Sequence, residues 1–312
     1  MTGATSPPAG RRIGYALLGR SFDYLLHLRP AEWPVMAFHT ALGGLLAHAA
    51  MPEPADAPWG SAWLGLALWV LCLNGGTLAI NSAFDRDEAD IAYLRRPPPP
   101  PPHLLAWGLS LMLGGLVISL SRLPGNFSLV YAICVALSVA YSVPPLRLKA
   151  VAGADWAINM VGFGALTPLA GWLALGVPVP LWGWLVIGGF CPLFAALYPL
   201  TQLYQMEEDR ARGDRTLALR LGTRASLQVA MVAALLAFAC FASAGWVFGW
   251  HGADWRWLAL AAALLAWLLV LIPWLRMGDR WRPEQHQGGM YRALAAWAVT
   301  DLAVAIAWLV RH

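Results

Sequence analysis

Long apolar runs alternate with short polar stretches along the chain, and this pattern predicts an all-α polytopic membrane protein. Nine runs approach the roughly 20 residues that a helix needs to cross a bilayer. They cover approximately residues 32–50, 59–82, 104–121, 127–143, 151–176, 179–201, 225–249, 256–275 and 290–310. Because no linker or soluble stretch interrupts the series, we expect one transmembrane domain over residues 1–312, with an N-terminal segment at 1–30.

The composition agrees with this interpretation. Hydrophobic residues make up 59% of the 312 positions and charged residues 12%, which excludes an ordinary soluble domain. We therefore expect the lipid bilayer, and no nucleic acid, as a partner. Each of the four cysteines falls inside an apolar run without paired spacing, which predicts small buried side chains rather than disulfides or metal ligands.

The distribution of Lys and Arg predicts the orientation in the membrane. With the N-terminus in the cytoplasm, 18 of the 21 basic residues lie on the cytoplasmic side, the bias that cytoplasmic loops carry. Nine crossings then place residues 1–30 inside and the C-terminus outside. The preference for Arg over Lys and the many Ala residues are typical of a GC-rich bacterial genome, so we expect the bacterial plasma membrane.

Two clusters of acidic and basic side chains lie at the ends of apolar runs on the predicted cytoplasmic side. The first is NSAFDRDEADIAYLRRPPPPPP, residues 81–102, and the second is QLYQMEEDRARGDR, residues 202–215. Charged groups beside hydrocarbon are costly unless water or a ligand compensates them. Two such clusters on one side of the membrane indicate a single polyanionic ligand, held through a divalent metal ion.

The spacing of oxygen-bearing side chains is consistent with a magnesium site. On regular helices each cluster places three of them on one face: Asn81, Asp85 and Glu88 in the first, and Gln202, Gln205 and Asp209 in the second. Mg²⁺ prefers oxygen ligands, keeps several waters and bridges phosphate oxygens. The candidate metal ligands are Asp85, Glu88, Asp90, Gln205 and Asp209.

Basic side chains near these clusters are candidates for direct contact with phosphate oxygens. Arg95 and Arg96 belong to the first cluster and Arg215 to the second. Lys149, the only lysine of the chain, lies between the clusters in YSVPPLRLK, residues 141–149. Prolines stiffen this segment, so we expect it to hold Lys149 beside both clusters. Arg would bind phosphate through its planar fork and Lys as a compact charge.

These segments resemble motifs of the UbiA superfamily of intramembrane prenyltransferases. Asn81 and Asp85 after the second span resemble its first aspartate-rich motif, and residues 141–149 resemble its loop between helices four and five. The segment EEDRARGDRTLALRLG, residues 207–222, is similar to its second motif and the helix start that follows. The resemblance extends over nearly the whole chain, including the number of spans and the loops in which the motifs fall.

The resemblance implies nine helices around a central cavity, a Mg²⁺-diphosphate site under a cytoplasmic cap, and an isoprenyl chain in a lipid-facing groove. It implies ionisation of an allylic prenyl diphosphate, followed by attack of a hydrophobic aromatic or lipid acceptor on the carbocation. Metal and guanidinium charge would stabilise the departing pyrophosphate. Catalysis would rest on Asp85, Asp209, Lys149 and Arg95. Substrate contacts would come from Asn81, Arg96, Tyr141, Arg147, Arg215, Asn159 and Asp155.

Three positions depart from the family pattern. Ser82 and Ala89 lie where the family carries Asp, and Gln205 matches the first Asp of the second motif. Which acid beside Ala89 completes the first metal site depends on the helix. At about 100° per residue, Glu88 lies about 60° from the central aspartate of the motif and Asp90 about 140°, so a regular helix selects Glu88. A one-residue π-bulge selects Asp90 instead.

Four polar residues fall inside predicted spans. Asp155 and Asn159 share a helix face near the cytoplasmic end, where they either reach the cavity or join two helices. Asp301, near the middle of the last span, is a candidate partner for a neighbouring helix. We interpret His39 as a structural histidine.

Two other functions remain open at this point. A terpene cyclase on the same scaffold would use the same diphosphate site without an acceptor. A transporter of an anionic lipid or metabolite should carry charged residues and broken helices near the membrane midplane. Eight of the 17 acidic residues of this chain lie in two loops on one side, which disfavours the transporter. The acceptor and the prenyl chain length are not determined by these patterns.

Overall fold

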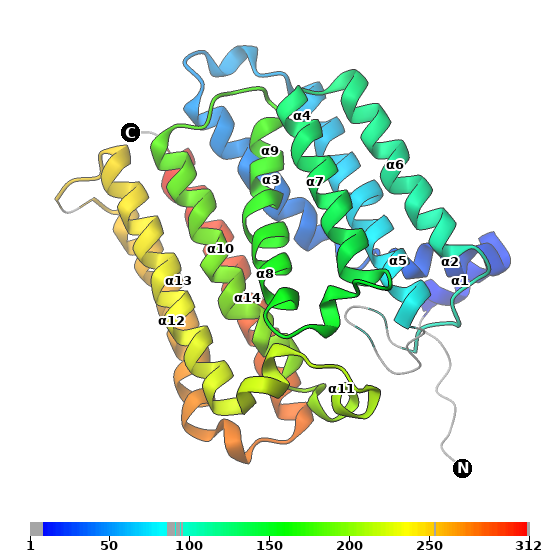
Figure 1. Cartoon of the computed structure of the whole chain (residues 1–312). Helices are drawn as coiled ribbons and strands as arrows, with labels where there is room; N and C mark the ends of the chain where they lie inside the picture. Colours follow the sequence, from blue (N-terminus) through cyan, green and yellow to red (C-terminus); the bar gives the residue numbers. More distant parts are fainter. Residues whose placement is uncertain (1–8, 86–90, 92–93, 95, 253, 311–312) are drawn as a thin grey trace.

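The computed structural model describes residues 9–85, 91, 94, 96–252 and 254–310, and in these ranges the protein is built of helices (Figure 1). The α-helices are α1 (Ala9–Leu18), α2 (Phe22–His27), α3 (Trp33–Ala50), α4 (Trp59–Ala67), α5 (Gly75–Asp85), α6 (Leu104–Arg122), α7 (Gly125–Ser142), α8 (Ala154–Asn159), α9 (Thr167–Leu173), α10 (Leu181–Gln202), α11 (Met206–Arg212), α12 (Leu217–Phe248), α13 (Arg256–Met277) and α14 (Pro283–Leu309). Short 3-10 turns are η1 (Gly19–Ser21), η2 (Pro54–Asp56), η4 (Leu148–Ala150) and η6 (Gly278–Arg280). Two π-helical segments are η3 (Leu68–Asn74) and η5 (Met160–Leu166).

Seven helices in the described ranges are long and apolar enough to cross a membrane. They are Trp59–Asp85, Leu104–Arg122, Gly125–Ser142, Leu181–Gln202, Leu217–Phe248, Arg256–Arg280 and Pro283–Leu309. The protein is therefore a multi-pass integral membrane protein, and seven of the nine predicted spans are confirmed by length and composition. The 27-residue helix Trp59–Asp85 combines α4, η3 and α5.

The two remaining predicted spans are helices inside the bundle. Residues 32–50 form α3, and residues 151–176 contain α8, η5 and α9 in succession. Both carry several polar or small residues, which lowers their hydropathy. They pack closely because Gly43 and Gly171 lie at the crossing: a Cβ on Gly43 would meet the Pro168 carbonyl oxygen at 1.7 Å, and one on Gly171 the Thr40 oxygen at 1.8 Å. Small residues allow this backbone approach inside membranes.

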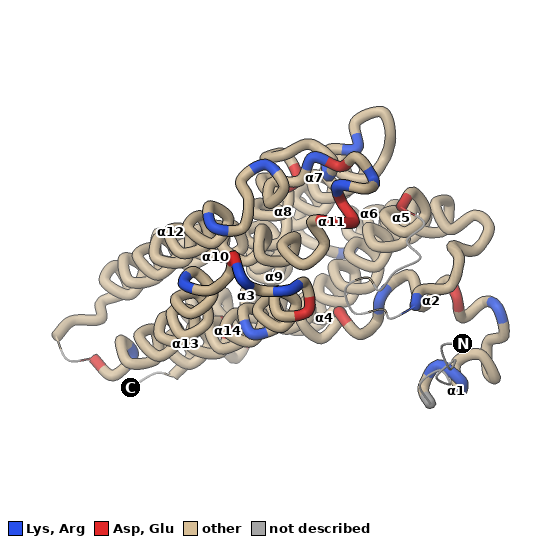
Figure 2. The backbone as a smooth tube through the Cα atoms, turned by 90° about the horizontal axis from the view of Figure 1, so that it is seen from below, with Lys and Arg blue, Asp and Glu red and all other residues tan. Residues whose placement is uncertain are grey.

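The two ends of the bundle differ in charge. The described chain starts at the lower right of Figure 1, beside the ends of α5 and α6, and α14 finishes at the upper left. Seen from below, basic and acidic residues occupy the loops and helix ends of this lower end (Figure 2). The ends of α5, α7 and α10 meet here with the short helix α11. This lower end therefore contains the polar groups that the sequence analysis selected.

Candidate functional site

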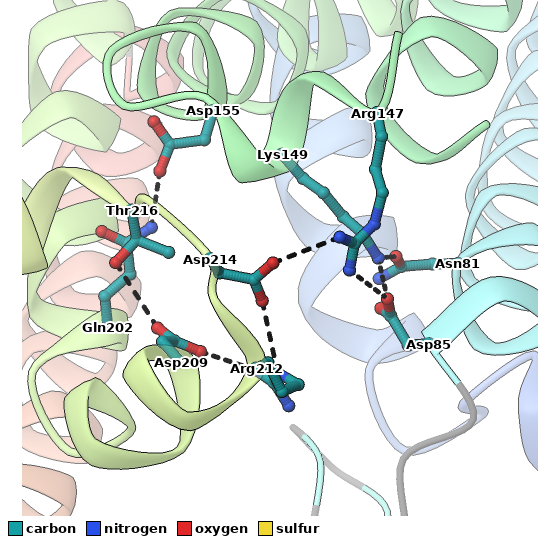
Figure 3. A network of polar contacts seen from close by, with 10 residues as sticks. All are labelled: Asn81, Asp85, Arg147, Lys149, Asp155, Gln202, Asp209, Arg212, Asp214 and Thr216. Carbon is teal, nitrogen blue, oxygen red and sulfur yellow. Dashed lines mark hydrogen bonds and ion pairs between the residues drawn. The ribbon is translucent and has the colours of Figure 1, made fainter. Parts of the chain in front are cut away.

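The first polar cluster pairs with the proline-rich segment between α7 and α8 (Figure 3). Asp85 is the last residue of α5, and its Oδ1 forms an ion pair with Nζ of Lys149. The same ammonium group donates a hydrogen bond to Oδ1 of Asn81 at 2.7 Å. Nη2 of Arg147 lies 3.6 Å from Oδ1 of Asp85. The structure thus places Lys149 against the first of the two clusters that the sequence analysis expected it to approach.

Asp214, a residue of the second cluster, connects Arg147 to Arg212. Its Oδ1 accepts a hydrogen bond from Nη1 of Arg147 at 3.2 Å, and its Oδ2 accepts one from Nε of Arg212 at 3.2 Å. Nη2 of Arg212 lies 2.5 Å from Oδ1 of Asp209. Carboxylates and cations therefore alternate in one continuous series between the two clusters (Figure 3). Opposite charges compensate one another where burial makes an unpaired charge costly.

A backbone contact fixes the two loops that carry this network. The N–H of Arg215 donates to the carbonyl of Ala150 at 3.3 Å, and Val151 forms an isolated parallel bridge with Arg215. The side chain of Arg215 is exposed. The loop before α12 and the loop after α7 therefore hold each other in place, although they are far apart in the sequence.

Asp155 is fully buried and joins helices. Its Oδ1 accepts from the N–H of Gly153 at 2.9 Å, and its Oδ2 accepts from Nε2 of Gln202 at 2.7 Å and from the N–H of Leu217 at 3.4 Å. Oε1 of Gln202 in turn accepts from the N–H of Ala218 at 3.1 Å. Both side chains satisfy free N–H groups at the start of α12. These contacts agree with the helix-joining interpretation of Asp155.

The second cluster does not lie on one continuous helix, and that expectation is wrong. Helix α10 ends at Gln202 and α11 begins at Met206, so a turn separates Gln202 from Asp209. Gln205 precedes α11, and its carbonyl accepts from the N–H of Asp209 at 2.9 Å. Gln202, the last residue of α10, is held by hydrogen bonds with Asp155 and with α12, and the chain turns directly after it.

Asp209 is almost entirely shielded from solvent. Burial raises the pKa of its carboxyl group above the ordinary range of aspartate, while the neighbouring Arg212 guanidinium opposes the shift. Oγ1 of Thr216 lies 3.5 Å from its Oδ2. The ionised form of this carboxylate therefore depends on the positive charge beside it.

An apolar cavity of about 350 Å³ opens beside the network. Asn81, which accepts the hydrogen bond from Lys149, is also part of its wall. Tyr141 and Tyr198 line it, with their hydroxyl oxygens 2.9 Å apart, and so does Asn159. Asn159 donates to the backbone carbonyl of Asp155 at 2.8 Å. The cavity thus begins where the charge network ends.

Both π-helical segments contribute to the cavity wall. Trp69, Leu73 and Asn74 of η3 and Gly162 and Phe163 of η5 line it. Such segments insert an extra residue in a helical turn and are frequent at functional sites. Apolar periodicity gives no signal for them, because the residues remain helical.

A second polar group on the cavity wall was not predicted from the sequence. It consists of Arg29, Glu32, Tyr204 and Tyr291. The Nε of Arg29 is buried without a hydrogen-bond partner in the described part of the chain. Burial raises the pKa of Glu32 above its ordinary range and that of Tyr204 to about 12. The Arg-Pro-x-Glu sequence before α3 is the signal that could have indicated this group.

Asp214 and Arg212 were also missed as members of the network. The sequence Arg-Gly-Asp-Arg, residues 212–215, was recognised as charged, but its carboxylate was not selected. Gly213 adopts a φ of 77°, which lets the chain reverse after α11. The reversal brings Asp214 beside Arg212 and toward Arg147.

Some predicted site residues lie outside the described residues: Glu88, Asp90 and Arg95. Arg96 is described; its side chain is exposed and its carbonyl accepts from Nη1 of Arg11 at 2.8 Å. Within the described ranges no group of three or more His, Cys, Asp or Glu side chains is arranged to hold a metal ion. A metal bound here would take few protein carboxylates, as Mg²⁺ does when it binds through phosphate oxygens and water.

Comparison with solved structures identifies the fold. A structure of digeranylgeranylglyceryl phosphate synthase matches with 16% identity over 92% of this chain and 98% of that chain, at a TM-score of 0.68. A UbiA homologue from Archaeoglobus fulgidus bound to DMAPP and Mg²⁺ matches with 17% identity over 91% and 99%, at 0.63. The apo UbiA homologue from Aeropyrum pernix K1 has 18% identity over 88% and 98%, at 0.61. The comparison with curated proteins gives no match.

The molecule is a helical membrane protein with a charge network at the mouth of an apolar cavity. The model of the UbiA prenyltransferase family matches residues 37–299. The chain therefore belongs to the UbiA prenyltransferase family, and membership in this family implies that it is a prenyltransferase.

Proposed function

We propose that this protein transfers a prenyl group from an allylic prenyl diphosphate to a hydrophobic acceptor within the membrane, in a Mg²⁺-dependent reaction. The observation that carries the proposal is the position of Asn81, which touches both the charge network through Lys149 and the apolar cavity. A prenyl diphosphate has the same two-part character, a polyanionic head and a hydrocarbon tail. The relatives bound to DMAPP or GPP together with Mg²⁺ support this assignment.

The cations of the network are suited to bind the diphosphate. Lys149, Arg147 and Arg212 each pair with a carboxylate. In the proposed complex they donate to phosphate oxygens and neutralise the charge that grows as the bond from carbon to oxygen breaks. Arg95, Arg96 and Arg215 stay candidates for further contacts. The tyrosine pair at the cavity mouth would exclude water from the allylic carbocation.

Asp85 and Asp209 are the candidate carboxylate ligands of Mg²⁺ among the described residues. They come from separate elements, α5 and α11, and each offers one carboxylate, which suits an ion that takes one or two carboxylates plus phosphate oxygens. Bound Mg²⁺ would supply Lewis-acid stabilisation of the leaving pyrophosphate. Glu88, Asp90 and Gln205 remain further candidate ligands, and the choice between Glu88 and Asp90 stays open.

The second polar group on the cavity wall favours transfer over cyclisation. Arg29, Glu32 and the Tyr204 hydroxyl offer donors and acceptors to the polar end of an acceptor, whereas a cyclase needs no such groups. The decisive experiment incubates purified protein and Mg²⁺ with prenyl diphosphates, with and without lipid extract. Prenylated product that requires the extract supports transfer. Pyrophosphate release without extract, with a cyclic hydrocarbon as product, would identify the cyclase instead.

We also propose nine crossings, with α3 and α8–α9 as the two additional spans, and the charged end in the cytoplasm of a bacterial cell. In a background without the four cysteines, Ala211→Cys is expected to react with a membrane-impermeant maleimide only after the cells are opened. Gly125→Cys should react in intact cells. Both positions are exposed, and nothing lies within 4 Å of a Cβ added at Gly125. Labelling of both from the same side would contradict the topology.

The proposed metal site should respond to pH through Asp209. Its carboxyl pKa is raised, so the metal-binding ionised form is lost on acidification at a higher pH than for an ordinary aspartate. Arg212→Ala removes the charge that lowers this pKa, and the acid limb of Mg²⁺-dependent activity is expected to move to higher pH. Arg210→Ala, an exposed neighbour on the same helix, is the control. An unshifted limb in Arg212→Ala would exclude Asp209 as the titrating group.

A further inference from the structure

Aromatic side chains line much of the deep end of the cavity. On η3, α10 and α14 the lining residue farthest from the charge network is aromatic: Trp69, Phe194 and Trp297. Phe163 of η5 lies with them and contacts the rings of Phe194 and Trp297, at centroid distances of 4.6 Å and 5.8 Å. Trp69 lies 16 residues before Asp85, about 24 Å along the helix axis at 1.5 Å per residue.

A buried polar pair lies directly behind this aromatic floor. Nδ1 of His39 on α3 is 3.1 Å from Oδ1 of Asp301 on α14, and both side chains are shielded from solvent. The His39 ring is stacked on Phe163 at 5.5 Å, with an interplanar angle of 10°. It also meets the edge of Trp297 at 5.1 Å. Neither member of the pair lines the cavity, but both touch residues that do.

The pair orients Trp297 directly. The indole Nε1 of Trp297 donates to Oδ2 of Asp301 at 3.1 Å, so one carboxylate holds both His39 and the tryptophan. Through this carboxylate, His39 on α3 is linked to Trp297, a side chain of the cavity wall on α14. The His39 ring fixes the other floor residue, Phe163, from behind.

Joining two helices does not by itself account for this pair. A carboxylate and an imidazole inside the membrane are costly, and well-packed apolar side chains join helices as well or better. Nε2 of His39 is buried with no hydrogen-bond partner among the residues that the structure describes, which adds to the cost. What the pair provides beyond adhesion is a fixed direction for the indole of Trp297.

We propose that His39 and Asp301 are positioning residues that hold Trp297 and Phe163 as a rigid floor, and that this floor limits the length of the prenyl chain the cavity accepts. The inference rests on the proposed function, because it concerns the tail of the same substrate. A prenyl chain whose head lies at the charge network extends toward the floor, and each further isoprene unit brings its end closer to Trp297. A fixed ring excludes a longer chain, whereas a mobile ring moves aside.

The test compares kcat/KM across all-trans prenyl diphosphates that differ by one isoprene unit. The length ratio is defined as kcat/KM for a chain longer than the wild-type optimum divided by kcat/KM for the optimal chain. Trp297→Ala and Asp301→Leu are expected to raise this length ratio by about 10-fold or more, which is the discrimination that pocket shape supplies. Trp267→Ala is the matched control. Trp267 is also fully buried and donates to α14, through Thr300 at 3.0 Å, but it does not line the cavity. The length ratio of Trp267→Ala should equal that of the wild type.

The outcomes separate the floor from the proposed function. If the wild type turns over but the length ratio is unchanged in folded Trp297→Ala and Asp301→Leu, the proposed role of the floor is wrong and the proposed function stands. A wild type that neither turns over nor is thermally stabilised by any prenyl diphosphate overturns both. If the two variants fail to fold, Trp297→Phe and His39→Gln replace them, since both keep a planar side chain at the site. A ratio shift in Trp267→Ala as large as that in Trp297→Ala would also overturn the floor.

Discussion

Asp85→Asn is expected to lower kcat/KM for prenyl diphosphate by at least about 100-fold, the scale on which removal of one preorganised electrostatic contact acts. The substitution keeps the shape of the side chain and an oxygen acceptor for Lys149, but it removes the negative charge that a metal ion needs. Asp209→Asn should have an effect of the same order from the other side of the site. In the wild type, a chelator should abolish turnover and added Mg²⁺ should restore it.

The control for this prediction is Asp254→Asn. Asp254 is also paired with an arginine, since Nε of Arg256 lies 2.9 Å from its Oδ1, but it precedes α13 at the opposite end of the molecule. Its replacement should leave kcat/KM close to the wild-type value. Full turnover by Asp85→Asn, or wild-type turnover indifferent to chelator, would refute the proposed metal site. Equal losses in Asp85→Asn and Asp254→Asn would point to a general effect on folding.

Lys149→Ala is expected to weaken prenyl diphosphate binding by about 10- to 100-fold, the range of one to two charge-assisted hydrogen bonds. The thermal stability should change little, because Asp85 keeps Arg147 at 3.6 Å as a partner. Binding of the corresponding prenyl alcohol should be unaffected, since it carries no phosphate. Lys149→Arg should recover part of the affinity, because it keeps the charge with a different geometry.

The absence of any other lysine from the sequence allows a direct check. An amine-specific acylating reagent should modify only Lys149 and the N-terminal amine, and prenyl diphosphate with Mg²⁺ should protect Lys149. Arg122→Ala, at the exposed end of α6, is the control for charge removal and should bind normally. Unchanged affinity in Lys149→Ala, or no protection by the ligand, would remove Lys149 from the diphosphate site.

Much of the helical architecture was predictable, because a chain in hydrocarbon must satisfy its backbone hydrogen bonds within each segment. Hydropathy therefore located the helix Trp59–Asp85 and the six other confirmed spans. High hydropathy is a weaker marker for α3 and for α8–α9. Much of their surface packs against other helices, including their close contact through Gly43 and Gly171, which makes high hydropathy less necessary.

Asn81, Asp85 and Lys149 were predicted together because a costly charge at a helix end needs a partner or a ligand, and few such charges exist in this chain. The break between α10 and α11 could not be predicted in the same way. The residue before the break, Gln202, bonds Asp155 and the start of α12, and these contacts come from distant parts of the chain. No local signal such as Gly or Pro marks residues 203–205.

The sequence by itself determined the class of the protein, its membrane-crossing segments and the chemical type of the site, since these follow from local composition and helix spacing. Only the tertiary structure decided which charges meet. Asp214 joins Arg147 across 67 positions of the chain, and His39 joins Asp301 across 262. Such pairs depend on the packing of helices far apart in the sequence, which hydropathy and spacing within one segment cannot specify.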